Sequence, residues 1–226
     1  MKKNIKLVAV DIDGTFVRSD YTYDIPRFKR ILSIMKDVGC RFVVASGNQY
    51  YQLRDLFPGY ADELSFVAEN GAFVKDRGAV SQEFFELTNI YYHRLEWTDD
   101  LKKVRDQILK FAPTVPEEKT YFYYDLFCDK LKGKVEPTTS GHGSIDLIVP
   151  GCHKASGLKR LVERWGISRK QCAAFGDGGN DIEMLNYCGY SYGMENASQD
   201  VKKAAKCICP SNEEDGVLVT LEKLFA

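Results

Sequence analysis

Short apolar runs alternate with helical patterns along the first 70 residues. Lys6–Val10, Arg41–Ala45 and Ser65–Ala68 are apolar runs that end at polar residues, as expected of buried parallel strands. Between the first two runs, apolar residues recur at helical spacing after a capping residue, Asp24, and Gly39 ends the pattern. This alternation predicts an α/β protein built on a Rossmann-like parallel sheet.

The pattern changes over residues 81–150, which predict a smaller α+β domain inserted into the core. Helices are expected at Asp99–Phe111 and at Glu117–Leu131; the second segment is rich in aromatics, but its length and its flanking proline and glycine favour a helix over a strand. Strands are expected at Val135–Thr139 and Ser144–Val149. Residues 1–80 and 151–226 are therefore predicted to form the core domain.

The core pattern resumes after the insert. Apolar runs at Cys172–Phe175, Tyr190–Tyr192 and Lys206–Ile208 predict further strands, and Val217–Phe225 predicts a closing helix. Before the insert, Ala72–Lys75 reads as part of a small hairpin next to the Asn70-Gly71 turn.

Composition narrows the class of partner. The chain has 31 basic and 32 acidic residues among 226, a net charge of −1, which gives no reason to expect nucleic-acid binding. Its apolar runs are far shorter than the ~18 residues of a membrane span. The seven cysteines form no Cys-x-x-Cys pair, so reduced thiols in a cytoplasmic protein are expected. A monomer is the default expectation.

Two acidic clusters follow buried strands. Asp11 and Asp13 stand two apart after the first strand, and Gly176–Asp181 follows a later one with Asp177 and Asp181. Carboxylates so close repel each other, so either a cation or a shared proton is expected between them. An EF-hand does not fit, because the glycine and the closing glutamate of that loop are misplaced. The alternative to a functional site is a plain acidic turn for Asp11 and Asp13, and a glycine-rich turn with an Asp helix cap for Gly176–Asp181.

Two further polar features belong to the same edge of the sheet. Ser46-Gly47-Asn48 opens a helix, where a hydroxyl and free N–H groups can hold phosphate oxygens, although these residues are also ordinary helix caps. Lys154 begins a later helix and alone would be read as an exposed lysine. Because ligands bind beyond the carboxyl ends of parallel strands, the four features are expected to meet around Mg²⁺ and a phosphoryl group.

In this order, Asp-x-Asp-Gly-Thr, a strand-end serine, a later lysine and Gly-Asp-Gly-x-Asn-Asp resemble the four motifs of the haloacid dehalogenase-like hydrolases. Val43–Asn48, Ala68–Ala72 and Gly176–Leu185 resemble the Cof-type sugar-phosphatase branch in particular. The resemblance covers most of residues 1–80 and 144–226. It implies a magnesium-dependent phosphatase acting on small phosphorylated metabolites, with sugar phosphates as the expected substrates.

The resemblance also implies residue roles. Asp11 would attack phosphorus, and Asp13 would protonate the leaving oxygen and later deprotonate water. The groups that would hold the phosphate or substrate are Ser46, Gly47, Lys154 and Asn180. The metal-binding groups would be Asp11, the backbone carbonyl of Asp13, and Asp177, with Asp181 supporting them from nearby. A phosphomutase of the same fold and a non-catalytic sugar-phosphate sensor remain alternatives, although a sensor has no need of a nucleophile.

The insert, called the cap in this family, is shorter here than usual. Residues are expected to be missing near Glu86–Tyr92, which bears on the cap's contacts with substrate. His142, between two glycines, is read as a turn residue rather than a substrate contact. Tyr121–Tyr124 is read as packing or cap surface rather than a platform for a sugar.

Overall fold

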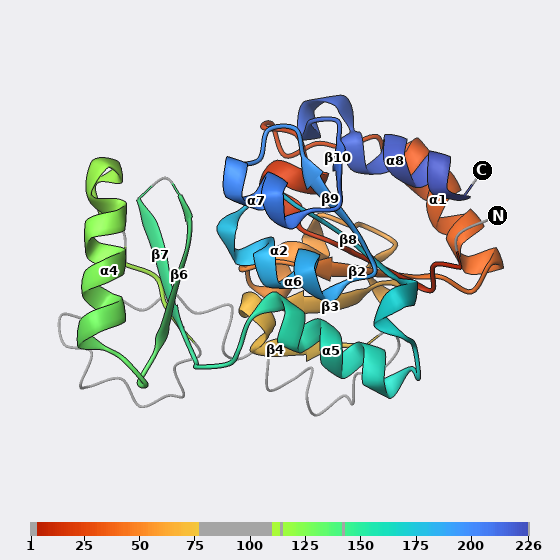
Figure 1. Ribbon diagram of the computed structural model, residues 1–226. Helices are drawn as coiled ribbons and strands as arrows, with labels where there is room; N and C mark the ends of the chain where they lie inside the picture. The colour runs from red at the N-terminus through yellow and green to blue at the C-terminus, as the bar shows by residue number, and fades with distance from the viewer. Residues whose placement is uncertain (1–3, 77–109, 114, 142, 226) are drawn as a thin grey trace.

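The computed structural model describes residues 4–76, 110–113, 115–141 and 143–225. Within them, two sheets lie side by side, a large one flanked by helices and a small one that carries a single helix (Figure 1). This arrangement confirms the predicted α/β class with a mostly parallel central sheet and a small α+β part. The boundaries of a core and an inserted cap stay a prediction.

The large sheet has seven strands, and all neighbours are parallel except the last pair. In spatial order the strands are β10 (Cys207–Cys209), β9 (Tyr190–Met194), β8 (Cys172–Gly176), β1 (Leu7–Val10), β2 (Arg41–Ala45), β3 (Ser65–Ala68) and β4 (Phe73–Lys75). The central strands are buried along nearly their whole length, which explains why they read as short continuous apolar runs.

Helices cover both faces of this sheet. They are α1 (Ile25–Asp37), α2 (Tyr50–Asp55), α5 (Lys154–Arg164), α6 (Ile182–Tyr187), α7 (Gln199–Ala204) and α8 (Gly216–Phe225). The first and last of these pack together on one face, whereas α5 and α6 pack together on the other (Figure 1). As predicted, α1 begins after Asp24, whose carboxylate accepts a 2.9 Å hydrogen bond from the N–H of Arg27.

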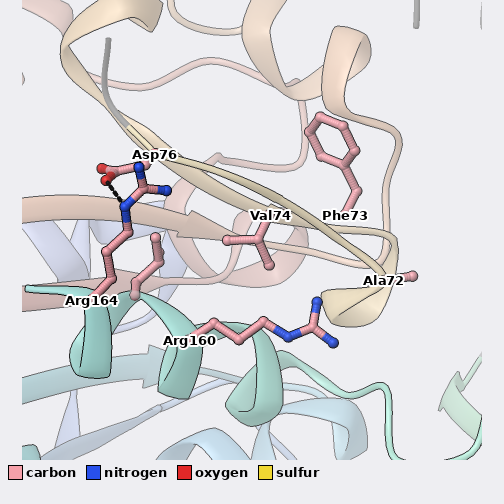
Figure 2. A pocket seen from close by; sticks show the side chains of 7 residues that line it. Ala72, Phe73, Val74, Asp76, Arg160 and Arg164 are labelled. Atoms are coloured by element: carbon pink, nitrogen blue, oxygen red, sulfur yellow. Dashed lines mark ion pairs between the residues drawn. The ribbon is translucent and has the colours of Figure 1, made fainter. Parts of the chain in front are cut away.

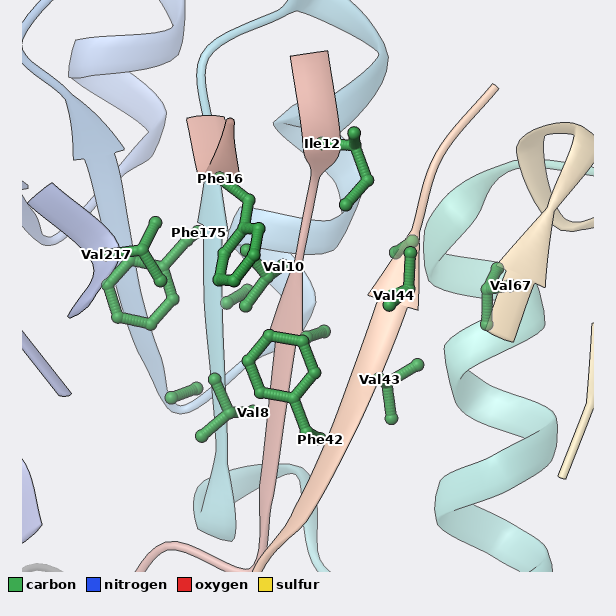
Figure 3. Close-up of a cluster of buried hydrophobic side chains, with 14 of the residues drawn as sticks. Val8, Val10, Ile12, Phe16, Phe42, Val43, Val44, Val67, Phe175 and Val217 are labelled. Carbon is green, nitrogen blue, oxygen red and sulfur yellow. The ribbon is translucent and has the colours of Figure 1, made fainter. Parts of the chain in front are cut away.

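The core between these layers centres on β1, β2 and β8 (Figure 3). Phe16 contacts the rings of Tyr23, Phe28, Phe42 and Phe57 at centroid distances of 4.9 to 5.8 Å, and all five side chains are buried. Truncating one such phenylalanine to alanine costs about 3–5 kcal/mol. Since Phe16 closes the turn that follows β1, this packing also fixes the backbone next to Asp11.

The small sheet contains β5 (Lys110–Phe111), β7 (Ser144–Ile148) and β6 (Glu136–Gly141), in that spatial order and all antiparallel. Helix α4 (Thr120–Lys130) packs on it, after a short helical turn at Glu117–Lys119, as predicted for this segment. The predicted helix Asp99–Phe111 is wrong at its end, because Lys110 and Phe111 pair with β7 as a strand. Residues 99–109 of that prediction lie outside the described residues.

Other predictions within the insert have mixed outcomes. Tyr121 and Phe122 are 74% and 65% exposed on α4, which agrees with the interpretation as cap surface. His142 and the segment near Glu86–Tyr92 lie outside the described residues. All seven cysteines are free thiols, and four of them are buried.

Candidate active site

Asp11 stands directly after β1, the central strand of the large sheet, and is only 6% exposed. The following turn, Ile12–Phe16, passes through Gly14 in a left-handed conformation with φ of +70°. A Cβ at Gly14 would lie 2.4 Å from Oδ2 of Asp177, so only glycine lets this turn approach the neighbouring loop. Thr15 completes the contact, because its hydroxyl donates a 2.7 Å hydrogen bond to Oδ1 of Asp177.

Three carboxylates converge at this edge. Asp11, Asp177 and Asp181 each offer an oxygen within 4.8 Å of the other two. Burial raises the pKa of Asp11 well above its usual value, and Asp181 raises it further, whereas Lys154 lowers it. Burial likewise raises the pKa of Asp177 to about 6, against the opposing hydrogen bond from Thr15. The site therefore concentrates negative charge that is costly to bury.

Lys154 supplies a positive charge among these carboxylates. Its ammonium, on a side chain only 1% exposed, donates 2.7 Å hydrogen bonds to Oδ1 of Asp11 and to Oδ1 of Asp181. Burial lowers the pKa of this lysine, but the two carboxylates outweigh burial and the pKa lies above its usual value. Unlike most lysines, Lys154 is buried, because the start of α5 is packed against the turn after β3: a Cβ at Gly71 would lie 2.3 Å from the carbonyl oxygen of His153.

Asp181 is already fully engaged by the protein. Its Oδ2 accepts 3.0 Å hydrogen bonds from the N–H groups of Asp177 and Gly178, while its Oδ1 accepts from Lys154. The side chain is fully buried. Asp181 thus shapes the loop after β8, and the oxygens open to a ligand belong chiefly to Asp11 and Asp177.

Asp13 lies at the rim of the site rather than within the carboxylate cluster. Its side chain is exposed, and its Oδ2 accepts a 2.7 Å hydrogen bond from Nδ2 of Asn48. Asn48 belongs to the loop after β2, where the buried hydroxyl of Ser46 accepts a 3.1 Å hydrogen bond from the Asn48 N–H. The structure therefore brings the first and second predicted motifs together across neighbouring strands.

Asn180 connects the loop after β8 to residues that the sequence analysis assigned no role. Its Nδ2 donates a 3.2 Å hydrogen bond to Oδ1 of Asn70, whose own Nδ2 donates a 2.9 Å bond to Asp146 on β7. Asn70 and its neighbour Glu69 are buried and both have left-handed φ, of +51° and +50°. Such conformations in non-glycine residues often mark functional segments. The sequence signals were the Asn70-Gly71 turn and the family resemblance of Ala68–Ala72, and neither gave Glu69 or Asn70 a role at the site.

A surface hollow lies between β4 and α5. It is lined by Ala72, Phe73, Val74, Asp76, Arg160, Leu161 and Arg164 (Figure 2). Arg164 pairs with Asp76 at 3.4 Å across it. None of its lining residues belongs to the carboxylate cluster, so the candidate chemistry lies at the strand ends.

The chain belongs to the haloacid dehalogenase-like hydrolases, because the family model matches residues 8–90 and 79–221. It is 39% identical to the 5-amino-6-(5-phospho-D-ribitylamino)uracil phosphatase YbjI of Escherichia coli, over 98% of this chain and 97% of that protein. The alignment runs over 262 positions, more than the 226 residues here, so the relative carries residues with no counterpart in this chain. The predicted family and enzyme class, a phosphoric monoester hydrolase, are confirmed.

Solved structures agree on the fold. The crystal structure of SMU.1108c from Streptococcus mutans has a TM-score of 0.87 and 33% identity, covering 97% of this chain and 98% of that one. A haloacid dehalogenase-like hydrolase from Bacillus subtilis has a TM-score of 0.80 at 18% identity, covering 96% and 99% of the two chains, and supports the fold alone. Among the described residues, no helix is both long enough and apolar enough to cross a bilayer.

Proposed function

We propose that this chain is a Mg²⁺-dependent phosphatase that hydrolyses small phosphate monoesters through a phosphorylated Asp11. The observation that carries the proposal is the convergence of Asp11, Asp177, Asp181 and Lys154 from segments far apart in the sequence. Three carboxylates, two of them buried and paired with a single lysine, retain excess negative charge. Family membership supports the same chemistry.

The donor set fits Mg²⁺. The available groups are carboxylate oxygens, which a hard divalent cation prefers, and neither histidine nor cysteine belongs to the described cluster. The residues that would hold the ion are Asp11 and Asp177 with the backbone carbonyl of Asp13, while Asp181 supports the loop. When bound, Mg²⁺ supplies positive charge that offsets the repulsion between a carboxylate and a phosphate dianion.

Asp11 is the proposed nucleophile. One of its carboxylate oxygens attacks phosphorus, a P–O bond forms, and the bond to the ester oxygen breaks. Lys154 holds the other side of the carboxylate and lowers its pKa against the effect of burial. Ser46 and Gly47, in the loop after β2, and Asn180, in the loop after β8, are the proposed contacts to the phosphate oxygens, together with Lys154.

Asp13 is the proposed general acid and base. Its exposed carboxyl group lies at the rim, where the ester oxygen would leave, and it gives that oxygen a proton. It then takes a proton from the water that attacks the phosphorylated aspartate, which releases inorganic phosphate and restores Asp11. The hydrogen bond from Asn48 holds the carboxyl group at the rim through both steps.

The substrate class follows from the proposed site and from the relatives. A sugar or sugar-alcohol phosphate is the proposed substrate, and the compound named for the E. coli relative, a phosphorylated ribitylamino uracil, is the first to test. The small sheet with α4 is the proposed cap, which closes over the site and chooses the leaving group. The free thiols fit the proposed cytoplasmic location.

The decisive experiment measures phosphate release from a panel of monoesters by purified protein. The panel contains the ribitylamino uracil phosphate, hexose and pentose phosphates, nucleotides and an aryl phosphate, each with Mg²⁺ and with chelator. We expect Mg²⁺-dependent release that is lost in Asp11→Asn and kept in Asp200→Asn, an exposed matched control. Isomerised sugar phosphate without free phosphate would instead establish a mutase, and binding without turnover a sensor.

A further inference from the structure

The two sheets meet at a polar cluster to which the proposed chemistry gives no role. This junction cluster consists of Glu69, Asn70, Lys110 and Asp146. Lys110 on β5 donates a 2.8 Å hydrogen bond to the carbonyl of Gly47 and a 3.1 Å bond to Oδ2 of Asp146. Asn70 donates to that same Oδ2 at 2.9 Å. Side chains of the small sheet thus bind directly to the loops at the strand ends of the large one.

The junction cluster borders the proposed phosphate site. Gly47 follows Ser46 directly, and a Cβ at Gly47 would lie 3.4 Å from Oδ2 of Asp146. On the other side, Asn70 accepts the hydrogen bond from Asn180. A molecule whose phosphate is held by Ser46 and Asn180 would therefore extend its leaving group toward Asp146.

The Lys110 ammonium is already committed within the cluster. Besides its two hydrogen bonds, it lies 3.6 Å from Oε2 of Glu69, too far for a hydrogen bond but close enough for charge attraction. That oxygen is buried and has no hydrogen-bond donor among the described residues. Two carboxylates thus share one ammonium, so the cluster has a net charge of −1, and the charge of Lys110 is already balanced within it.

Asp146 offers the accessible acceptor. Its side chain is 19% exposed, and both hydrogen bonds that the described residues make to it go to Oδ2. Oδ1 can therefore accept a hydrogen bond from a hydroxyl or N–H group. Glu69 holds Lys110, and Lys110 holds Asp146, so these two act as positioning residues.

We infer that Asp146 selects leaving groups that donate hydrogen bonds and that the junction cluster rejects leaving groups that carry a carboxylate. The inference rests on the proposed function, since it concerns the leaving group of the same reaction. Like charges a few ångströms apart near a protein surface repel strongly enough to change a rate at least tenfold.

The test compares two nearly isosteric substrates, glycerol 3-phosphate and 3-phosphoglycerate, which differ by a hydroxymethyl group against a carboxylate. We expect kcat/KM of the wild type to favour glycerol 3-phosphate by about tenfold or more. In Asp146→Asn this ratio falls at least fivefold, because kcat/KM on 3-phosphoglycerate rises. Glu69→Gln shifts the ratio in the same direction. A gain on one substrate cannot come from a damaged fold.

The controls separate this inference from the proposed function. Asp129→Asn, on the exposed side of α4, keeps the wild-type ratio. An aryl phosphate reports turnover without the leaving-group contact, so loss of its hydrolysis would count against the phosphatase itself. Calorimetry on Asp11→Asn protein then measures the dissociation constants of both esters without turnover. If wild type and Asp146→Asn had the same ratio of kcat/KM between the two substrates, or if neither ester bound, the proposed selection by Asp146 would be overturned.

Discussion

The Lys154 ammonium lies 2.7 Å from Oδ1 of Asp11, although 143 residues separate the two in the chain and the lysine side chain is 1% exposed. The ion pair joins the first residue of α5 to the end of β1. It brings the charge that the site needs into a place from which water is excluded. Such a pair is costly to break from one side, because the remaining charge stays buried.

Replacing Lys154 with methionine should therefore destabilise the protein as well as inactivate it. Asp11 and Asp181 would lose their shared cation, and we expect a loss of about 3–5 kcal/mol in the free energy of unfolding, measured by urea denaturation with chelator present. Lys159 lies on the same helix, and its side chain is 62% exposed. Lys159→Met should therefore change the free energy of unfolding by less than about 0.5 kcal/mol. Equal stability of the two variants would contradict a structural role for the buried pair.

Gly14→Ala tests the close approach of the turn after β1 to Asp177. The new Cβ would lie 2.4 Å from a carboxylate oxygen, so Asp177 must shift, and we expect phosphate release to fall by at least tenfold. Gly59→Ala is the matched control, because Gly59 has φ of +81° with nothing within 4 Å of the added Cβ. In both variants the left-handed backbone should lower the free energy of unfolding by about 1–2 kcal/mol, but only Gly14→Ala should lose activity. Similar activity in both would count against the placement of Asp177.

Much of the site was predictable because each motif is a local sequence pattern and the parallel sheet determines where the motifs meet. Asp11, Ser46 and Asp177 each follow a buried apolar run, and β8, β1 and β2 are neighbours in the sheet. Carboxyl ends of parallel strands share one edge, so separate sequence clusters had to meet there. The contact of Lys154 with this edge followed from the family resemblance, since its position at a helix start alone suggested exposure.

The junction between the sheets was not predictable in this way. The sequence pattern predicts Lys110 at the end of a helix, because apolar residues continue at helical spacing up to Phe111; pairing with β7 overrides that pattern. Asp146 reads only as a polar residue on an alternating strand, and its contact with Asn70 depends on how two sheets pack. Local patterns carry no information on such a relationship.

Mg²⁺ should stabilise the folded protein by binding to the carboxylate cluster. Only the folded state brings Asp11 and Asp177 together. We therefore expect the free energy of unfolding to rise by about 2.7 kcal/mol when the Mg²⁺ concentration is a hundred times its dissociation constant. Asp177→Asn should abolish this increment, whereas Asp200→Asn, whose side chain is 81% exposed, should keep it. The measurement is urea denaturation with Mg²⁺ and with chelator at constant ionic strength. An increment that survives in Asp177→Asn would mean that the ion binds elsewhere.

Ionisation of the Tyr23 phenol should lower the free energy of unfolding at alkaline pH. Burial raises the pKa of its phenol to about 12, above the value near 10 of an unfolded chain, and the hydroxyl donates a 3.0 Å hydrogen bond to the carbonyl of Leu56. A pKa raised by folding favours the protonated form in the folded state. The stabilisation by this phenol is therefore complete below about pH 10 and is lost as the pH rises toward 12.

Tyr23→Phe separates this effect from other groups that titrate in alkali, such as Cys40, whose pKa burial also raises to about 12. At neutral pH the variant should be less stable by about 1 kcal/mol, the worth of one hydrogen bond. Between about pH 10 and 12 the wild type should lose stability faster, so the difference narrows and then reverses. Tyr21→Phe, at a side chain 63% exposed, should show no such trend. A wild-type advantage that stays constant across this range in urea denaturation would show that the Tyr23 phenol is not held protonated by its burial.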